Sequence, residues 1–424
     1  MNKTELLALI EADEQKHLQF LQSFIRAPSP NPPGDTVQAA QVIREYLSSH
    51  DIDCETIAPQ ERMPNILSEC TGGAGDGPRI IMNGHIDVFP VGDAEGWTYC
   101  PYSGHNDGTY IHGRGGVDMK AGTAASIIAF TYLYLNSEHL RGKLSLAIVS
   151  DEETGGRWGS KYLLEHEPRI RGDCMINAEP GGLQSIRFGE KGTLRLTFTV
   201  RTVGGHGAYT HAVEGANRIM LRLIHRLDSV QDLLPDLDPD LRRYLEREDV
   251  RRVADEIMGT GAADSLLKVT LNIGTIHGGL KVNMIPERCV MEADIRLPLG
   301  MDRKVVLDHI DTILKDFSQV TLQVQEAASN PSNHCSEKHP LLKAIATNAE
   351  AVIGRKPLAI PGLGATDAKF WRYRGIPAYE LGVSPATMAA TNERVEIREF
   401  LAVVKIHALA IWDYLGGPSV RSTA

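Results

Sequence analysis

The sequence lacks the patterns of several common protein classes. None of its six cysteines forms a Cys-x-x-Cys pair, which argues against a zinc-thiolate site and favours reduced thiols in a cytoplasmic protein. No uninterrupted apolar run approaches the length of a membrane-spanning helix. The first twenty residues space their charges through an amphipathic helical pattern, which is unlike a secretory signal. We therefore expect a cytoplasmic protein with no membrane partner.

Positive charge is also scarce. Lysine and arginine number 44 against 54 acidic residues, which gives a formal net charge of −10. This balance excludes a general nucleic-acid or anionic-membrane binder. The sequence has no Gly-x-Ser-x-Gly elbow, no His-Glu-x-x-His helix and no Walker loop, and Gly362 and Gly364 are too few and wrongly placed for a dinucleotide fingerprint. At 424 residues, two domains are expected.

Helical and strand patterns alternate through the first part of the chain. Such alternation predicts an α/β domain with a mainly parallel sheet and helices on both faces. The expected helices cover residues 5–27, 35–50 and 121–135, and the expected strands cover residues 79–82, 143–150 and 174–177.

The pattern changes after about residue 191 to a β-α-β-β-α-β order, which is typical of a small open-faced sandwich. Its strands are expected at 193–201, 268–275, 289–296 and 321–325, and its helices at 214–227 and 303–317. Residues 231–265 are acidic, contain proline and then turn helical, which suggests an insertion. The α/β pattern returns near residue 330, so we expect an α+β domain at 191–327 inserted into one formed by 1–190 and 328–424.

Side chains with a carboxylate or an imidazole occur at four places in the predicted α/β domain. They are His85 with Asp87, Asp118, the pair Glu152–Glu153, and Glu179. Taken alone, each group has an ordinary structural explanation instead of metal binding, such as a helix cap for Asp118 or a solvated turn for the glutamate pair. Ligands collect at the carboxyl ends of parallel strands, so the four together indicate a metal site. Oxygen and imidazole ligands suit zinc, cobalt or manganese, and a bridging carboxylate suits two metals about 3.5–4 Å apart.

Four motifs carry a resemblance to a known family. Asn-Gly-His-Ile-Asp-Val (83–88), Gly-Arg-Gly-Gly-Val-Asp-Met-Lys-Ala-Gly (113–122), Ser-Asp-Glu-Glu-Thr-Gly-Gly (150–156) and Asn-Ala-Glu-Pro (177–180) are similar to those of the M20 metallopeptidases and deacylases. That family includes acetylornithine deacetylase, succinyl-diaminopimelate desuccinylase, aminoacylase-1 and glutamate carboxypeptidase. The likeness spans essentially the whole chain, in the family's order.

The resemblance implies a role for each of these groups. His85, Asp118 and Glu179 would hold one zinc, and Asp118 would bridge to a second zinc held by Glu153 and a late histidine. Asp87 would orient His85, and Glu152 would be the general base for the metal-bridging water. The domain formed by 1–190 and 328–424 would then be the zinc-binding catalytic domain, and 191–327 a lid and dimerisation domain.

The sequence departs from the family pattern at the late histidine. That residue usually lies three positions before an Asn-Glu or Asp-Glu pair; here the pair is Asn392-Glu393, and position 389 is Ala389. Three explanations remain open: an engineered substitution that inactivates the enzyme, a natural pseudoenzyme, or a natural variant with a different metal site or a misaligned motif.

The resemblance also implies substrate contacts. His206 would cross a dimer interface and stabilise the oxyanion in the neighbouring subunit, while Asn283 and Arg296 would contact the substrate's carboxylate. Gly364 and Thr366 belong to a loop that would line the same cleft. We therefore expect a homodimeric, dinuclear zinc amidohydrolase acting on an N-acyl amino acid or dipeptide. The alternative is a catalytically silent relative that binds a small carboxylated ligand.

Overall fold

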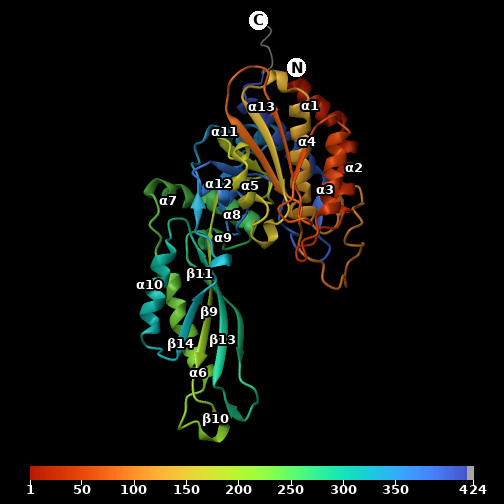
Figure 1. The fold of residues 1–424 in the computed structure, drawn as a ribbon. Coiled ribbons are helices and arrows are strands. Elements are labelled where there is room, and N and C mark those ends of the chain that lie inside the picture. The colour runs from red at the N-terminus through yellow and green to blue at the C-terminus, as the bar shows by residue number, and fades with distance from the viewer. Residues whose placement is uncertain (418–424) are drawn as a thin grey trace.

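A computed structural model describes residues 1–417 and shows an α/β body from which a narrower unit projects (Figure 1). The body contains a nine-stranded sheet in the order β1-β2-β6-β3-β7-β17-β8-β15, with β16 also paired to β8. Its centre, from β6 to β17, is parallel, and the outer pairs β1-β2, β2-β6, β17-β8 and β8-β15 are antiparallel, whereas β16 pairs with β8 in parallel. The strands are β1 (Glu55–Ile57), β2 (Asn65–Thr71), β3 (Arg79–His85), β6 (Lys143–Val149), β7 (Cys174–Asn177), β8 (Ser185–Glu190), β15 (Asn333–His334), β16 (Leu358–Gly362) and β17 (Ala378–Glu380).

Helices surround this sheet, and the mixed α/β class predicted from the sequence is confirmed. They are α1 (Lys3–Ala12), α2 (Glu14–Ile25), α3 (Val37–Ser48), α4 (Ala121–Tyr134), α5 (Ser160–His166), α11 (Pro340–Ile353), α12 (Ala368–Arg372) and α13 (Ile397–Tyr414). The single helix predicted over 5–27 is wrong, because α1 ends before Asp13 and α2 starts after it. Asp13 accepts a hydrogen bond from the Tyr132 hydroxyl of α4 at 2.8 Å, a tertiary contact that helical periodicity does not report.

The projecting unit is an antiparallel four-stranded sheet, in the order β11-β13-β9-β14, covered by two helices. Its elements are β9 (Gly192–Arg201), α6 (Ala216–Leu227), β11 (Thr270–Gly278), β13 (Arg288–Leu297), α10 (Arg303–Leu314) and β14 (Val320–Val324), which is the predicted β-α-β-β-α-β order. Leu194, Leu196, Phe198 and Val200 alternate along β9 and are all buried, because one face of the strand packs beneath the helices. A short pair, β10 (Gly205–His206) and β12 (Met284–Ile285), lies at the far tip (Figure 1).

Two smaller groups complete the fold. A three-stranded sheet combines β4 (His105–Asn106), β5 (Tyr110–His112) and β18 (Arg394–Glu396). The predicted insertion contains α7 (Pro239–Leu245), α8 (Glu248–Met258) and α9 (Ala262–Leu266). Its apolar residues join the core of the α/β body, and the Tyr244 hydroxyl donates to the Ala359 carbonyl of β16 at 2.9 Å. This segment therefore packs against the body, although in the sequence it lies between elements of the projecting unit.

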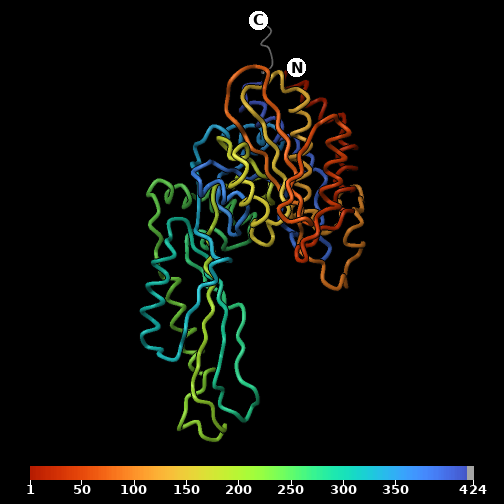
Figure 2. Tube along the Cα trace, viewed as in Figure 1, coloured from red at the N-terminus to blue at the C-terminus, as the bar shows by residue number. Residues whose placement is uncertain are grey.

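The chain passes from the body to the projecting unit through a neck of paired backbone. Thr193 and Asn330 exchange two backbone hydrogen bonds of 2.8 Å, and the tube view shows the green and cyan segments running side by side there (Figure 2). The buried Lys191 ammonium donates to the carbonyls of Ser265 and Lys268 at 2.7 and 2.8 Å. No helix within residues 1–417 has the length and apolar character that a membrane crossing needs.

Candidate metal centre and active site

Three predicted ligands converge at the carboxyl edge of the central sheet. His85 ends β3, and its Nε2 lies 3.2 Å from an Asp118 oxygen and 3.4 Å from a Glu179 oxygen. All three ligand atoms lie within 4.8 Å of one another. His85 Nε2 is buried and makes no hydrogen bond. Burial alone would lower the His85 pKa, but the surrounding carboxylates outweigh it and raise this pKa well above its ordinary value. Such a negative environment around an imidazole suits a metal cation.

The backbone around Asp118 is held by Glu393. The Glu393 carboxylate is 1% exposed and accepts bonds from the backbone N–H groups of Val117 (2.8 Å) and Asp118 (3.2 Å). Arg114 donates to its other oxygen at 2.6 Å. Gly115 precedes this turn with φ +75°, and a Cβ there would lie 2.2 Å from a Val88 methyl group, so only glycine fits. Glu393 thus fixes the position of the Asp118 carboxylate.

The backbone of Glu152 and Glu153 follows β6 and wraps around the Asp87 carboxylate. The Asp87 carboxylate accepts backbone bonds from Glu152 (3.2 Å) and Glu153 (3.1 Å), and a side-chain bond from Asn31 (2.9 Å). His85 Nδ1 lies 2.9 Å from the Asp87 carbonyl oxygen and 3.4 Å from its carboxylate. Asp87 therefore contacts both His85 and the turn that carries the glutamates.

Burial raises the pKa of both glutamates. For Glu153 the burial, with the Asp118 charge next in importance, raises the pKa to about 11, and its Oε1 is a buried oxygen without a hydrogen-bond partner. Burial raises the Glu152 pKa well above its usual range, although the nearby Lys369 ammonium opposes this. Burial and the Asp118 charge raise the pKa of Glu179 to about 7. The three carboxyls share one desolvated, like-charged environment that a cation would relieve.

A buried cationic group lies directly behind this acidic cluster. Lys369 is 3% exposed, and its Nζ lies 3.7 Å from Glu152 Oε1 and 2.6 Å from the Thr366 carbonyl oxygen. The fully buried Arg372 pairs with Glu380 at 2.8 Å and with Glu190 at 3.4 Å. Thr366 Oγ1 bonds to both of these glutamates, at 3.0 and 3.1 Å.

Ala389 lies in the loop before β18, with a positive φ of +57°. The residue is exposed, and the neighbouring Met388 side chain lines the cleft. Within residues 1–417, the group of His85, Asp118 and Glu179 is the one set of three or more clustered ligands that could hold a metal ion. Glu153 is not part of such a set.

The predicted substrate residues lie in two separate places. Arg296, Gly364 and Thr366 line the cleft of about 550 Å³ that also exposes Asp118, Glu152, Glu153 and Glu179. His206 and Asn283 lie instead at the tip of the projecting unit, where the Gly207 N–H donates to the Asn283 carbonyl at 2.8 Å. Neither residue lines the cleft of its own chain.

Comparison with known proteins assigns the family. The sequence model of peptidase family M20/M25/M40 matches residues 81–413. The chain belongs to this family. Succinyl-diaminopimelate desuccinylases of Cereibacter sphaeroides and Gluconacetobacter diazotrophicus are each 28% identical, over 92% and 94% of this chain and 97% of theirs. Membership of this family makes the chain a hydrolase of amide or peptide bonds.

Solved structures with low sequence identity share the fold. The M20 family metallo-carboxypeptidase Sso-CP2 from Sulfolobus solfataricus superposes with a TM-score of 0.78 at 19% identity, covering 94% of this chain and 99% of that one. Human carnosine dipeptidase 1 gives a TM-score of 0.74 at 16% identity, covering 97% and 98%.

Sequence reasoning missed several residues that shape the site. Glu393 served only to locate position 389, and no role was predicted for Asn31, Lys369, Arg372, Glu190 or Glu380. The Asp-x-Lys-x-x-Arg spacing at 367–372 places Lys369 and Arg372 about one helical turn apart on α12, which is a detectable signal. The residues that meet them are distant in the sequence, so the contacts themselves leave no local pattern.

Proposed function

We propose that this chain is a zinc-dependent amidohydrolase that cleaves the amide bond of an N-acyl amino acid or a related dipeptide. The supporting observation is that His85, Asp118 and Glu179 converge beside Glu152 in a cleft that Arg296 also lines. The cluster suits a metal ion, Glu152 suits a base, and an arginine fork suits the substrate's carboxylate. The names of the relatives, desuccinylase and dipeptidase, agree with this substrate class.

The donor set fits a metal ion at one position. His85, Asp118 and Glu179 supply three ligands, and the buried, unpaired His85 Nε2 is among them. A zinc ion held there, or cobalt or manganese in its place, supplies Lewis-acid chemistry to the amide carbonyl and to water. In the proposed roles Asp87 orients His85, and Glu152 takes the proton from the attacking water.

A second metal would have only Asp118 and Glu153 as protein ligands, because Ala389 offers none. We therefore expect nearer one zinc per chain than two after dialysis, measured by metal analysis. Two tightly held zinc ions would show that position 389 is not needed as a ligand.

The activity test is a screen of N-acyl amino acids and dipeptides with the zinc-loaded protein. Glu152→Gln should lower turnover about 10²–10⁴-fold without loss of zinc, because it removes the base. Glu165→Gln, on the exposed surface of α5, is the matched control and should retain full turnover. A chelator should abolish the activity, and added zinc should restore it.

Ala389 favours a second candidate, a silent protein that only binds a carboxylated ligand. The substitution Ala389→His separates the two. If the enzyme proposal is right, restoring the ligand should raise turnover by at least about 10–100-fold, which is the range for losing even a supporting partner of a metal ligand. If both versions are inactive on the whole panel yet bind its members, the silent protein is the better description.

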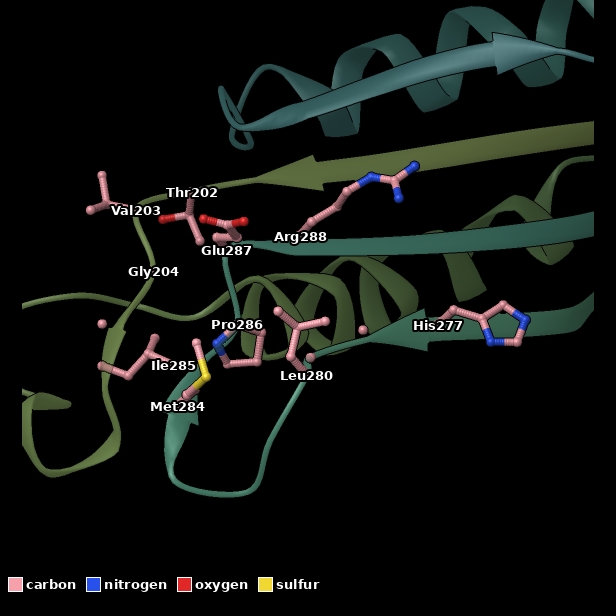
Figure 3. A pocket seen from close by; sticks show the side chains of 13 residues that line it. Thr202, Val203, Gly204, His277, Leu280, Met284, Ile285, Pro286, Glu287 and Arg288 are labelled. Atoms are coloured by element: carbon pink, nitrogen blue, oxygen red, sulfur yellow. The ribbon is translucent and has the colours of Figure 1, made fainter.

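We also propose that the chain forms a homodimer through the domain formed by residues 191–327, with residues 1–190 and 328–424 as the catalytic domain. The tip exposes large apolar side chains, with Val203, Leu280 and Val282 71%, 86% and 101% exposed. Figure 3 shows Leu280, Met284, Ile285 and Pro286 gathered around a cavity of about 630 Å³ there. Exposed apolar groups of this kind mark protein interfaces, and a two-fold dimer would cover them on both copies.

Such a dimer would carry His206 to the cleft of the partner, where an imidazole donor could stabilise the developing oxyanion. Losing a donor of this kind costs about 10²–10³-fold in turnover in other hydrolases. The test mixes two inactive parents in the Ala389→His background, Glu152→Ala and His206→Ala. Hybrid dimers would contain one intact cleft, so subunit exchange should recover activity; no recovery despite confirmed exchange would remove His206 from the shared site.

The cysteines support a proposal about the cellular compartment. All six are free thiols in the structure, and Cys100 is exposed. Free thiols persist in reducing compartments, so we propose that the enzyme works in the cytoplasm.

A further inference from the structure

A proline-rich segment that follows α2 lies against the candidate metal centre. Residues 28–33 read Pro-Ser-Pro-Asn-Pro-Pro, and the match to the family model begins only at residue 81. Proline has no N–H and a fixed φ, so such a segment cannot continue a helix or join the middle of a sheet. Its two polar side chains, Ser29 and Asn31, are nevertheless 0% and 3% exposed. They are therefore buried for contacts other than those of regular secondary structure.

The backbone of this segment pairs with the residues on both sides of Asp87. The Val88 N–H donates to the Ser29 carbonyl at 3.0 Å, and the Asn31 N–H donates to the Val88 carbonyl at 2.9 Å. The Ser29 hydroxyl donates to the Ile86 carbonyl at 2.6 Å. The segment is therefore held in one register beside Asp87.

The Asn31 side chain joins two parts of the site. Its Nδ2 lies 2.9 Å from Asp87 Oδ2 and 2.9 Å from Thr154 Oγ1. A carboxylate only accepts hydrogen bonds, so the nitrogen of the amide, and not its oxygen, must face Asp87. The NH₂ group has two hydrogens, and each of them has a partner. Asn31 thus connects the carboxylate beside His85 to the turn that carries the glutamate pair.

The charge of Asp87 makes a neutral donor suitable at this place. Asp87 is 0% exposed, and its ion-pair partner within residues 1–417 is His85 alone, at 3.4 Å. A buried carboxylate needs hydrogen bonds to replace its water. A lysine or arginine could supply them, but its positive charge would repel a metal ion bound to the other side of His85. The asparagine amide stabilises the carboxylate without this repulsion.

We propose that Asn31 is a positioning residue of the metal centre that acts through Asp87. It holds the Asp87 carboxylate in the orientation that fixes the His85 ring, and it links that carboxylate to Thr154. The proposal rests on the proposed function for its effect on turnover, whereas its effect on zinc binding requires no substrate.

The test measures zinc affinity by chelator competition with the full-length protein. Asp87→Ala should weaken zinc binding about 10–100-fold, the range for partners that orient a metal ligand. Asn31→Ala removes a contact one step further from the metal, so a loss of about 10-fold is expected, at the lower end of that range. With substrate, kcat should fall with little change in KM, because Asn31 does not line the cleft.

The double variant is the sharpest test. If Asn31 acts through Asp87, Asn31→Ala should cause no additional loss of zinc affinity in an Asp87→Ala background, because residues in one hydrogen-bond network are not additive. Asn31→Ser has a hydroxyl that is too short to span both partners. It should behave like Asn31→Ala, and it takes the place of that variant if Asn31→Ala fails to fold.

A matched control is Asn348 of α11, which is fully buried and lies outside the cleft. Its Nδ2 also donates to a carboxylate, Asp413 at 2.8 Å, and to a second acceptor, the Ala344 carbonyl at 2.9 Å. Asn348→Ala should therefore lower Tm about as much as Asn31→Ala does. Its zinc affinity should equal that of the parent.

Four outcomes would overturn the role of Asn31. They are a zinc affinity of Asn31→Ala equal to that of the parent, an equal loss in Asn348→Ala, additive losses in the double variant, and a parent that binds no zinc. A failed substrate screen with the expected zinc affinities would instead refute the proposed hydrolysis and leave the positioning role of Asn31 supported.

Discussion

The two units of this protein are built from very different interiors. Between residues 194 and 332, all described by the structure, no polar or charged side chain is buried, and the core consists of groups such as Phe198, Met220 and Leu223. The α/β body buries lysine, arginine, aspartate, glutamate and histidine side chains, including Lys120, Lys369, Arg372 and His407. Burying charge is unfavourable unless it is paired or hydrogen-bonded; Arg372 is paired with Glu190 and Glu380, and Lys120 donates to two backbone carbonyls. The projecting unit instead has an apolar interior.

The largest expected contrast is in the stability that buried and exposed ion pairs contribute, and it concerns the buried cluster of Arg372, Glu190 and Glu380. Arg372→Met would leave Glu190 and Glu380 buried without their cation, and breaking a buried pair of this kind costs about 3–5 kcal/mol of unfolding free energy. The matched control is Arg226→Met in the projecting unit, whose pair with Asp316 is 54% and 62% exposed and should contribute at most about 1 kcal/mol. Urea denaturation measures both; equal losses would contradict the comparison.

The pH dependence of stability should also reside in the body. Burial lowers the pKa of His407 to about 4, and its Nε2 hydrogen-bonds the Leu381 carbonyl at 2.9 Å. An unfolded histidine has a pKa of about 6.5, so between these values the unfolded state binds the proton more readily. This contribution is complete above pH about 6.5 and falls by roughly 3 kcal/mol as the pH drops towards 4.

His407→Gln keeps a donor for Leu381 but cannot titrate. The variant should therefore lose less stability than the parent between pH 7 and pH 4.5, as measured by denaturation at both values. His309→Gln in α10 of the projecting unit, where the ring is only partly buried, is the matched control for the substitution itself. Parallel profiles for the parent and His407→Gln would show that this histidine does not set the dependence.

A smaller effect is expected on metal binding. Glu393→Gln keeps the size of the side chain but weakens the bonds to Val117, Asp118 and Arg114. Partners that orient metal ligands typically contribute about 10–100-fold to affinity, so zinc should dissociate more readily by that factor in a chelator competition. Glu396→Gln, three residues on and outside the cleft, should bind zinc like the parent.

The smallest predicted effect is on turnover through Lys369. Lys369→Met removes the cation 3.7 Å from Glu152 and should lower kcat about 10-fold with little change in KM, because Glu152 loses its orienting partner. Lys369→Arg should recover part of kcat. An effect on KM alone, or no rescue by arginine, would give Lys369 a role other than positioning Glu152.

Which features the sequence could predict depends on how far apart in the chain the interacting residues lie. His85, Asp118, Glu152 and Glu179 stand next to strands or turns whose patterns are local, and parallel strands bring such ends to one edge of the sheet. Arg372 and Glu190 are 182 positions apart, and their contact depends on the order in which the strands assemble. The break at Asp13 likewise depends on Tyr132 of another helix. The side chains of the candidate site were therefore predictable, whereas the buried charges that pack behind them were not.

The positive φ of Ala389 bears on which side chains its loop can carry. A left-handed backbone disfavours β-branched and bulky residues, while asparagine, aspartate and histidine adopt it more readily than most. Histidine at position 389 would therefore suit the observed backbone. The ligand that we propose for Ala389→His would thus need no change in the backbone conformation of this loop.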